Sequence, residues 1–173
     1  MVKIDIDEPI HIEEYNPEWP RQYSEEADNL LKSLSSFQPE LAHFGSTAVP
    51  GMPAKPIIDI LIGIDVIPPH IEFVKKLISI GYEYLGEAGV KGRHYFRRRG
   101  SVNFNLAVVQ KASVLWKENL AIRDYLRTHS EDVRAYGELK RAVIASGAKT
   151  LLDYSAGKAE FMLELLQKAH SKP

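Results

Sequence analysis

Hydrophobic residues recur every three or four positions in five stretches of the chain, the spacing that places them on one face of an α-helix. The first helix is expected to begin with Asn16 as its N-cap and Pro17 at its first helical position, and its apolar stripe continues to Leu34. The other stretches predict helices over residues 69–80, 113–128, 130–146 and 153–169. In the helix over 69–80, the residues expected to face the core are Ile71, Val74, Leu77 and Ile78.

Short runs of β-branched and aromatic residues between these helices predict strands. The run over residues 57–64 is apolar on both faces except for one carboxylate, which is typical of a buried strand. Further strands are expected over residues 9–15, 41–44, 82–85, 93–97 and 102–109, the last two joined as a hairpin by residues 97–101. This order predicts an α+β fold with α/β character, in which helices back a mixed sheet and three helices follow it.

Composition narrows the possible functions. The 173 residues suit a single domain over 1–173, and the absence of cysteine excludes disulfide scaffolds and Cys-ligated metal sites. Lys and Arg number 22 against 23 Asp and Glu, so we expect no nucleic-acid partner, and Arg97, Arg98 and Arg99 are interpreted as a solvated turn. No apolar run approaches ~18 residues and residues 1–15 lack a signal-like core, so no membrane and a cytoplasmic location are expected. The oligomeric state stays open.

Gly45, Ser46 and Thr47 directly follow a predicted strand. Glycine lets the backbone approach a ligand closely, and the free N–H groups and hydroxyls of such a turn can hold a phosphate. The alternative is an ordinary exit from the strand into a loop. The turn is not a P-loop, because Met52 stands where the lysine of that motif belongs.

Asp59 interrupts the apolar run over 57–64, on the same strand face as Ile57 and Leu61. A buried carboxylate must be paired or bind a metal. Lys55, in the proline-rich segment before the strand, could pair with Asp59 or contact an anionic ligand. The residues themselves leave a structural and a functional role for Asp59 equally open.

The C-terminal helices carry polar pairs at i, i+4, which share a helix face. If these pairs converge near Ser46 and Asp59, they form a basic pocket suited to phosphate; otherwise they are solvated helix faces. His94, on a predicted strand, is a candidate proton carrier or phosphate contact, or else a half-buried strand histidine. The three helical pairs are Arg123 with Arg127, Tyr136 with Lys140, and Tyr154 with Lys158.

The segment HFGSTAVPGMPAKPIIDILIGI, residues 43–64, closely resembles the signature of the GrpB family, in the nucleotidyltransferase-like (polymerase β-like) superfamily. EEYNPEWPRQYSEEA, IRDYLRTHSEDVRAYGELK and YSAGKAEFMLELLQKA resemble the same family, so the likeness covers nearly the whole chain. It implies that Gly45 and Ser46 grip a nucleotide's phosphates. It also implies that Asp59 belongs to a set of carboxylates that hold divalent metal.

The chain departs from the superfamily pattern at that carboxylate set. Leu61 stands where a second carboxylate is expected, and the strand that should supply a third offers Asn103 and Asn105, so Mg²⁺ would bind weakly at Asp59. Asp59 is the predicted catalytic and metal-binding residue. The residues predicted to bind phosphate or nucleotide are Gly45, Ser46, Thr47, Lys55, His94, Asn105, Arg123, Arg127, Lys140 and Lys158.

These observations predict a nucleotidyltransferase-related protein that binds a nucleotide or another phosphorylated small molecule and has reduced or lost transfer chemistry. One alternative is an active metal-dependent transferase with ligands from elsewhere, such as Asp124 or Glu87, whose oxygens would have to lie within ~5 Å of Asp59. Another is a non-catalytic interaction module, in which side chains would fill the pocket.

Overall fold

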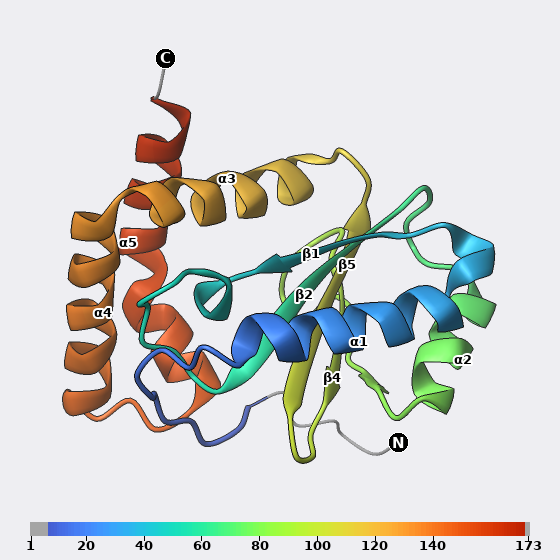
Figure 1. The fold of residues 1–173 in the computed structure, drawn as a ribbon, viewed down its shortest axis with the longest axis horizontal. Coiled ribbons are helices and arrows are strands. Elements are labelled where there is room, and N and C mark those ends of the chain that lie inside the picture. The colour runs from blue at the N-terminus through green and yellow to red at the C-terminus, as the bar shows by residue number, and fades with distance from the viewer. Residues whose placement is uncertain (1–6, 172–173) are drawn as a thin grey trace.

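The computed structural model describes residues 7–171, and its centre is a five-stranded mixed sheet (Figure 1). The strand order is β1-β2-β5-β4-β3, in which β2 and β5 run parallel and the other neighbours run antiparallel. The predicted α+β class is therefore confirmed. The strands are β1 Glu40–Phe44, β2 Ile57–Ile64, β3 Glu83–Tyr84, β4 His94–Arg98 and β5 Asn103–Gln110.

The predicted helices all form within the described residues, with ends shifted by a few positions. None of the described helices is long and apolar enough to cross a membrane. Residues 1–6, part of the segment in which no signal peptide was predicted, lie outside the description. The helices are α1 Trp19–Ser33, α2 Ile71–Ser79, α3 Val114–Thr128, α4 Ser130–Ala145 and α5 Leu151–His170, with short 3₁₀ turns η1 Ser35–Phe37 and η2 Ser46–Ala48.

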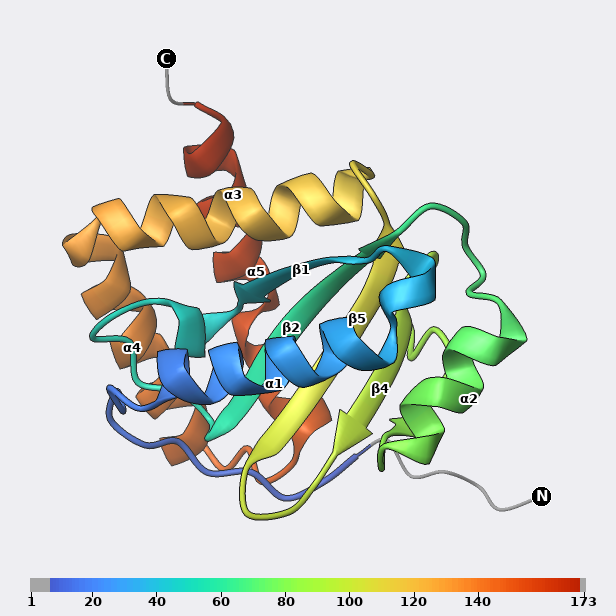
Figure 2. The ribbon, with the colours of Figure 1, turned by 45° about the vertical axis from the view of Figure 1, so that its right-hand side comes forward.

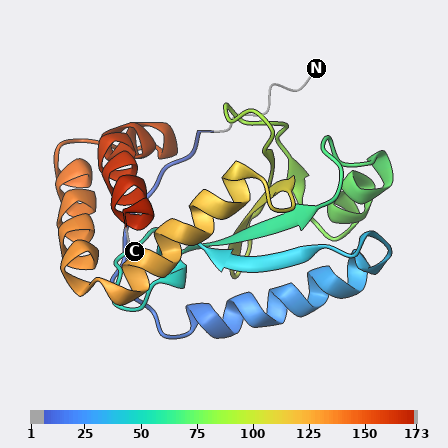
Figure 3. The same cartoon turned by 90° about the horizontal axis from the view of Figure 1, so that it is seen from above.

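The two faces of the sheet are covered by different helices (Figure 3). On one face, Ile58, Ile60 and Ile62 of β2 pack in one cluster with α1 and α2. On the other, Leu61 of β2 and Ala107 of β5 pack under α3. Alternation along β2 therefore places Asp59 on the face covered by α3.

Helices α4 and α5 stand together beyond one end of the sheet, and the C-terminal part of α3 packs with them (Figure 2). The loop after β1 is tied to them by Val49 and Met52, which pack with Leu126 of α3, Tyr136 of α4 and Leu165 of α5. This third cluster places the Gly45 turn between the sheet and the helices.

One predicted strand does not form, and several predicted boundaries shift, two of them at α1 and β3. Residues 9–15 form no strand of the sheet, because they cross between elements and pair only singly, through Pro9 with Thr150 and Glu13 with Ala54. Helix α1 begins at Trp19 rather than Pro17, with Glu18 as its N-cap. Strand β3 is confined to Glu83–Tyr84 instead of 82–85.

The inward face of α2 also differs from the prediction. Ile71 and Ile78 are 57% and 51% exposed, whereas Phe73 is fully buried beside Val74 and Leu77. Both stripes satisfy helical spacing. Phe73 decides between them, because its ring packs edge-on against Phe37 with centroids 5.3 Å apart.

Close packing of α4 against α5 requires glycine at position 157. A Cβ there would lie 2.7 Å from Val143 Cγ1, closer than real carbon contacts. We expect Gly157→Ala to destabilise the protein by about 1–3 kcal/mol, the usual cost of overpacking. Urea unfolding measures this loss, and the double variant Gly157→Ala/Val143→Ala should recover part of it; a double variant no better than Gly157→Ala would contradict the packing explanation.

Candidate functional site

A cavity of about 130 Å³ lies between the loop after β1, the first half of β2 and the three C-terminal helices. Its walls combine cationic, aromatic and apolar side chains with a single carboxylate. Side chains therefore do not fill the space that the family resemblance assigns to a ligand. The lining residues are Phe44, Gly45, Ser46, Thr47, Ala54, Lys55, Ile57, Asp59, Asn119, Ile122, Arg123, Leu126, Tyr136, Tyr154, Lys158 and Met162.

The Gly45 turn lies directly against Asp59. Phe44 pairs with Asp59 in the antiparallel register of β1 and β2, so the chain leaves β1 beside this carboxylate. Gly45 has φ 71° and ψ −170°, a conformation open essentially to glycine alone. A Cβ at this position would lie 2.9 Å from Asp59 Oδ2. Glycine therefore permits both the turn and its close approach to the acid.

Asp59 is held from two sides. Asn105 Nδ2 donates to Asp59 Oδ1 at 2.8 Å, as the parallel register of the two residues allows. Lys55 Nζ lies 3.1 Å from Asp59 Oδ2, and both side chains are mostly buried, at 14% and 18% exposed. The carboxylate thus has an ammonium partner in the cavity wall and an amide partner, Asn105, that does not line the cavity.

A hydrogen-bonded chain continues from Asn105 to the N-terminal segment. Arg99 Nη2 donates to Asn105 Oδ1 at 2.9 Å, and the same guanidinium makes two contacts to the Glu8 carboxylate. The interpretation of Arg97, Arg98 and Arg99 as a solvated turn was therefore wrong. Each guanidinium pairs with a separate acid, because the hairpin places them beside Glu83, Glu26 and Glu8 respectively.

Lys140 is fully buried behind the Gly45 turn rather than in the cavity lining. Its ammonium donates to Ser46 Oγ at 2.5 Å and to the Pro53 carbonyl at 2.8 Å, and it lies 4.2 Å from the centre of the Tyr136 ring. Burial, with Lys158 and Lys55 nearby, lowers the pKa of Lys140 well below its ordinary value. Lys140 therefore holds both ends of the loop between β1 and β2.

Lys158 lines the cavity from α5. Its ammonium lies 4.3 Å from the centre of the Tyr154 ring and 5.9 Å from that of Tyr136, distances typical of cation–π contacts. No hydrogen-bond acceptor contacts it within the described residues. Burial lowers the pKa of Lys158 to about 8, although Asp59 opposes the shift.

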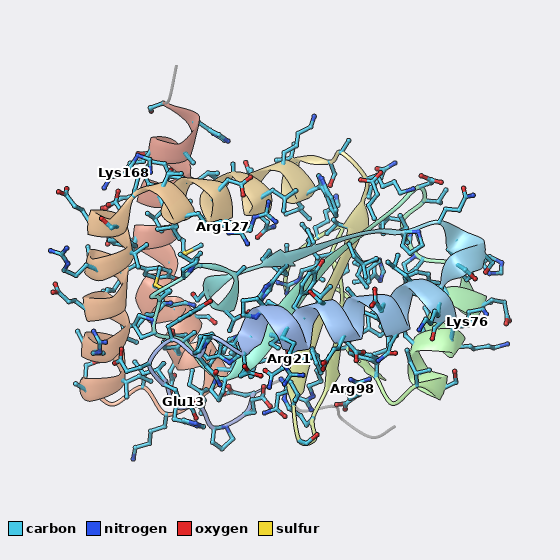
Figure 4. The ribbon with its side chains drawn as sticks, in the orientation of Figure 1. Glu13, Arg21, Lys76, Arg98, Arg127 and Lys168 are labelled. Atoms are coloured by element: carbon cyan, nitrogen blue, oxygen red, sulfur yellow. The ribbon has the colours of Figure 1, made fainter. Side chains whose placement is uncertain are left out.

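Arg123 of α3 reaches the end of β1, and Arg127 of the same helix reaches the segment after β1. Arg123 lines the cavity and donates to the His43 carbonyl at 3.0 Å. Arg127 donates to the Ala48 carbonyl at 2.9 Å and is not among the lining residues; Figure 4 shows it beneath α3, on the side of this segment. Arg123 can contact a ligand directly, whereas Arg127 fixes the loop.

His94 is not brought to the cavity. It alternates with Tyr95 along β4 and faces away from Asp59, and its Nδ1 lies 2.6 Å from the Tyr84 hydroxyl.

Thr47 lies in the cavity wall, but its hydroxyl is 2.9 Å from His43 Nε2. Burial lowers the pKa of His43 to about 4, so this histidine is neutral near pH 7.

The family model described as GrpB protein matches residues 9–168. The chain belongs to the GrpB family. The UPF0157 protein YqkA of Bacillus subtilis is 32% identical over 149 residues, which are 86% of this chain and 43% of YqkA, so the chain spans less than half of that relative's length.

Solved structures agree with this membership. The crystal structure of the conserved protein GrpB from Enterococcus faecalis matches this GrpB chain with a TM-score of 0.79 and 32% identity, covering 92% of this chain and 96% of that one. The Cid1 poly(U) polymerase, in its structure with Mg and 3'-dATP bound, matches with a TM-score of 0.50 and 15% identity, covering 69% of this chain and 39% of Cid1. The second likeness concerns the fold alone, which is nucleotidyltransferase-like.

Sequence reasoning missed two polar residues of the GrpB site. Asn119 lines the cavity four residues before Arg123, so the shared face of α3 could have indicated it. Arg99 does not touch Asp59 but holds Asn105, which does. Only the pairing of β2, β5 and β4 brings Arg99 close to Asn105. The proposed atypical ligands lie elsewhere: neither Asp124 nor Glu87 lines the cavity, since Asp124 is exposed beside Arg123 and Glu87 accepts from the Gly92 amide.

Proposed function

We propose that this GrpB protein binds a nucleotide or another phosphorylated small molecule in the cavity beside the Gly45 turn. Three cationic side chains and a single carboxylate around one cavity carry this proposal: Lys55, Arg123 and Lys158 line it together with Asp59. Lys55 pairs with Asp59, and Arg123 contacts Asp124, an exposed acid outside the cavity lining, so the lining itself carries more cations than carboxylates. Lys158 has no carboxylate partner among the described residues. In a partly enclosed site such charges favour a multivalent anion.

The rest of the wall suits the organic part of such a ligand. Phe44, Ile122 and Met162 supply apolar surface, and the rings of Tyr136 and Tyr154 lie beside the cations. Small-molecule sites generally combine a mostly apolar lining with a few polar groups that fix orientation. An anionic head with a planar or aliphatic body is the chemistry that this combination favours.

Transfer chemistry is proposed to be reduced or absent, because the cavity contains one carboxylate. In-line phosphoryl transfer with two metal ions needs several anionic oxygens around the reacting atoms. Beside Asp59 the cavity offers the neutral Asn119, Ser46 and Thr47 instead. The proposed activity is therefore binding.

A thermal-shift screen of nucleoside mono-, di- and triphosphates tests the binding proposal. A ligand present at about 100 times its Kd should stabilise the protein by about 2.7 kcal/mol. Lys158→Met should remove most of this stabilisation, because it deletes a cation from the cavity wall. Lys168→Met is the matched control, because Lys168 lies near the C-terminal end of α5 (Figure 4), is exposed, and pairs with Asp132 away from the cavity. A screen without stabilisation, or equal losses in both variants, would contradict the proposal.

A further inference from the structure

The donor groups around Asp59 do not fit the magnesium ion that the nucleotidyltransferase-like fold implies. Mg²⁺ takes an octahedron of oxygen ligands, usually with one or two carboxylates whose oxygens point at the metal. Here Asp59 Oδ1 accepts from Asn105 Nδ2 at 2.8 Å, and Oδ2 lies 3.1 Å from Lys55 Nζ. Both oxygens therefore already face donors.

The orientation of the Asn105 amide is fixed by its other neighbour. Arg99 Nη2 lies 2.9 Å from Asn105 Oδ1 and has only hydrogens to offer. A flipped amide would set its NH₂ against the guanidinium and its oxygen against the Asp59 carboxylate, two repulsive contacts in place of two hydrogen bonds. Asn105 therefore presents N–H groups, not a ligand oxygen, to the space beside Asp59.

The neighbouring positions on this sheet face supply no further ligands. Leu61 of β2 and Ala107 of β5 are the next residues on the same face after Asp59 and Asn105, and they pair with each other. Both are buried among apolar side chains. Among residues 7–171, no group of three or more acidic or histidine side chains could hold a metal ion. The charge that a metal would supply must come from another source.

Lys55 has the position and chemistry to supply it. Its ammonium contacts both Asp59 oxygens, at 3.1 and 3.4 Å, and lines the cavity. An ammonium carries three donors, so two contacts to one carboxylate leave a donor for a phosphate. The backbone of Lys55 is held close to Asp59, because only Pro56 separates Lys55 from the first residue of β2, Ile57.

We propose that Lys55 takes the place of a divalent cation at Asp59, so that the cavity binds its phosphorylated ligand without metal. Asp59 is then a positioning residue, which holds the ammonium where Lys55, Arg123 and Lys158 face one anion. This proposal rests on the proposed function, because it specifies how the same cavity recognises phosphate.

Metal dependence of binding is the test, with ATP, UTP and inorganic pyrophosphate as probes. In calorimetric titrations, the wild-type protein should bind its best probe as tightly in EDTA as in excess Mg²⁺. Lys55→Met should weaken binding in EDTA by about tenfold or more, the effect of losing one charge-assisted contact. Lys75→Met is the control, because Lys75 also pairs with a single carboxylate, Glu72, but on the solvent-exposed side of α2, and its loss should change nothing.

Mn²⁺ titration followed by water-proton relaxation gives a readout that needs no nucleotide. The wild-type protein should not bind Mn²⁺ in the cavity, whereas Lys55→Met/Asn105→Asp, which replaces the ammonium and adds a second carboxylate, should bind it. Wild-type probe binding that requires Mg²⁺, or wild-type Mn²⁺ binding that Asp59→Asn abolishes, would overturn the proposal. If no probe binds in either buffer, the proposed function fails, and the Mn²⁺ arm still decides whether Lys55 excludes metal from Asp59.

Discussion

Gly45→Ala should both destabilise the protein and abolish ligand binding. The residue occupies φ 71° with ψ −170°, and side chains other than hydrogen cost about 1–3 kcal/mol there. The new Cβ would also lie 2.9 Å from Asp59 Oδ2, so the turn or the carboxylate must shift. Together these effects predict a loss of at least about 2 kcal/mol in urea unfolding. A displaced Asp59 would also carry Lys55 out of its place in the cavity.

Gly51→Ala separates backbone strain from the contact with Asp59. Gly51 also has a positive φ, 77°, in the same loop, but a Cβ there would meet nothing within 4 Å. Gly51→Ala should therefore show only the strain and should retain ligand-induced stabilisation in thermal-shift assays. If the two variants lost equal stability and bound ligand equally well, the close approach of Gly45 to Asp59 would have no functional consequence.

The fold was largely predictable because its elements have clear local signals. The run over 57–64 forms β2 at the predicted residues, since β-branched side chains and the preceding proline fix its start. The predictions that failed concern choices made by tertiary contacts. Spacing on α2 allowed two inward faces, and Phe37, distant in sequence, selects the one with Phe73.

The candidate site was predictable in its residue types and less so in their roles. Helical spacing pointed to Lys140 and Lys158 in similar terms, yet one is buried under Ser46 and the other lines the cavity. That difference depends on how deeply each helix packs against the loop, which no local pattern records. The link from Arg99 through Asn105 to Asp59 depends likewise on strand register across the sheet.

Ligand affinity should decrease as pH rises above about 8, because the cavity contains a lysine that loses its proton there. Burial lowers the pKa of Lys158 to about 8 in the free protein. An anion binds the ammonium form and not the neutral amine, so affinity should be level below pH 8 and fall above it by up to about tenfold per pH unit. Phosphate groups of the ligand are already ionised in this range, since their second pKa lies near 6.

Lys158→Arg identifies the titrating group, because a guanidinium stays charged throughout this range. The variant should bind with nearly level affinity from pH 7 to about 10, and Lys158→Met should bind weakly with an equally level profile. Binding is measured by calorimetric titration with the probe that the screen selects. The other groups near this ammonium are Asp59, Lys55, Lys140, Tyr136 and Tyr154. A decline that persists in Lys158→Arg would assign the titration to Lys140, whose pKa is also lowered by burial, and would contradict a direct role for Lys158.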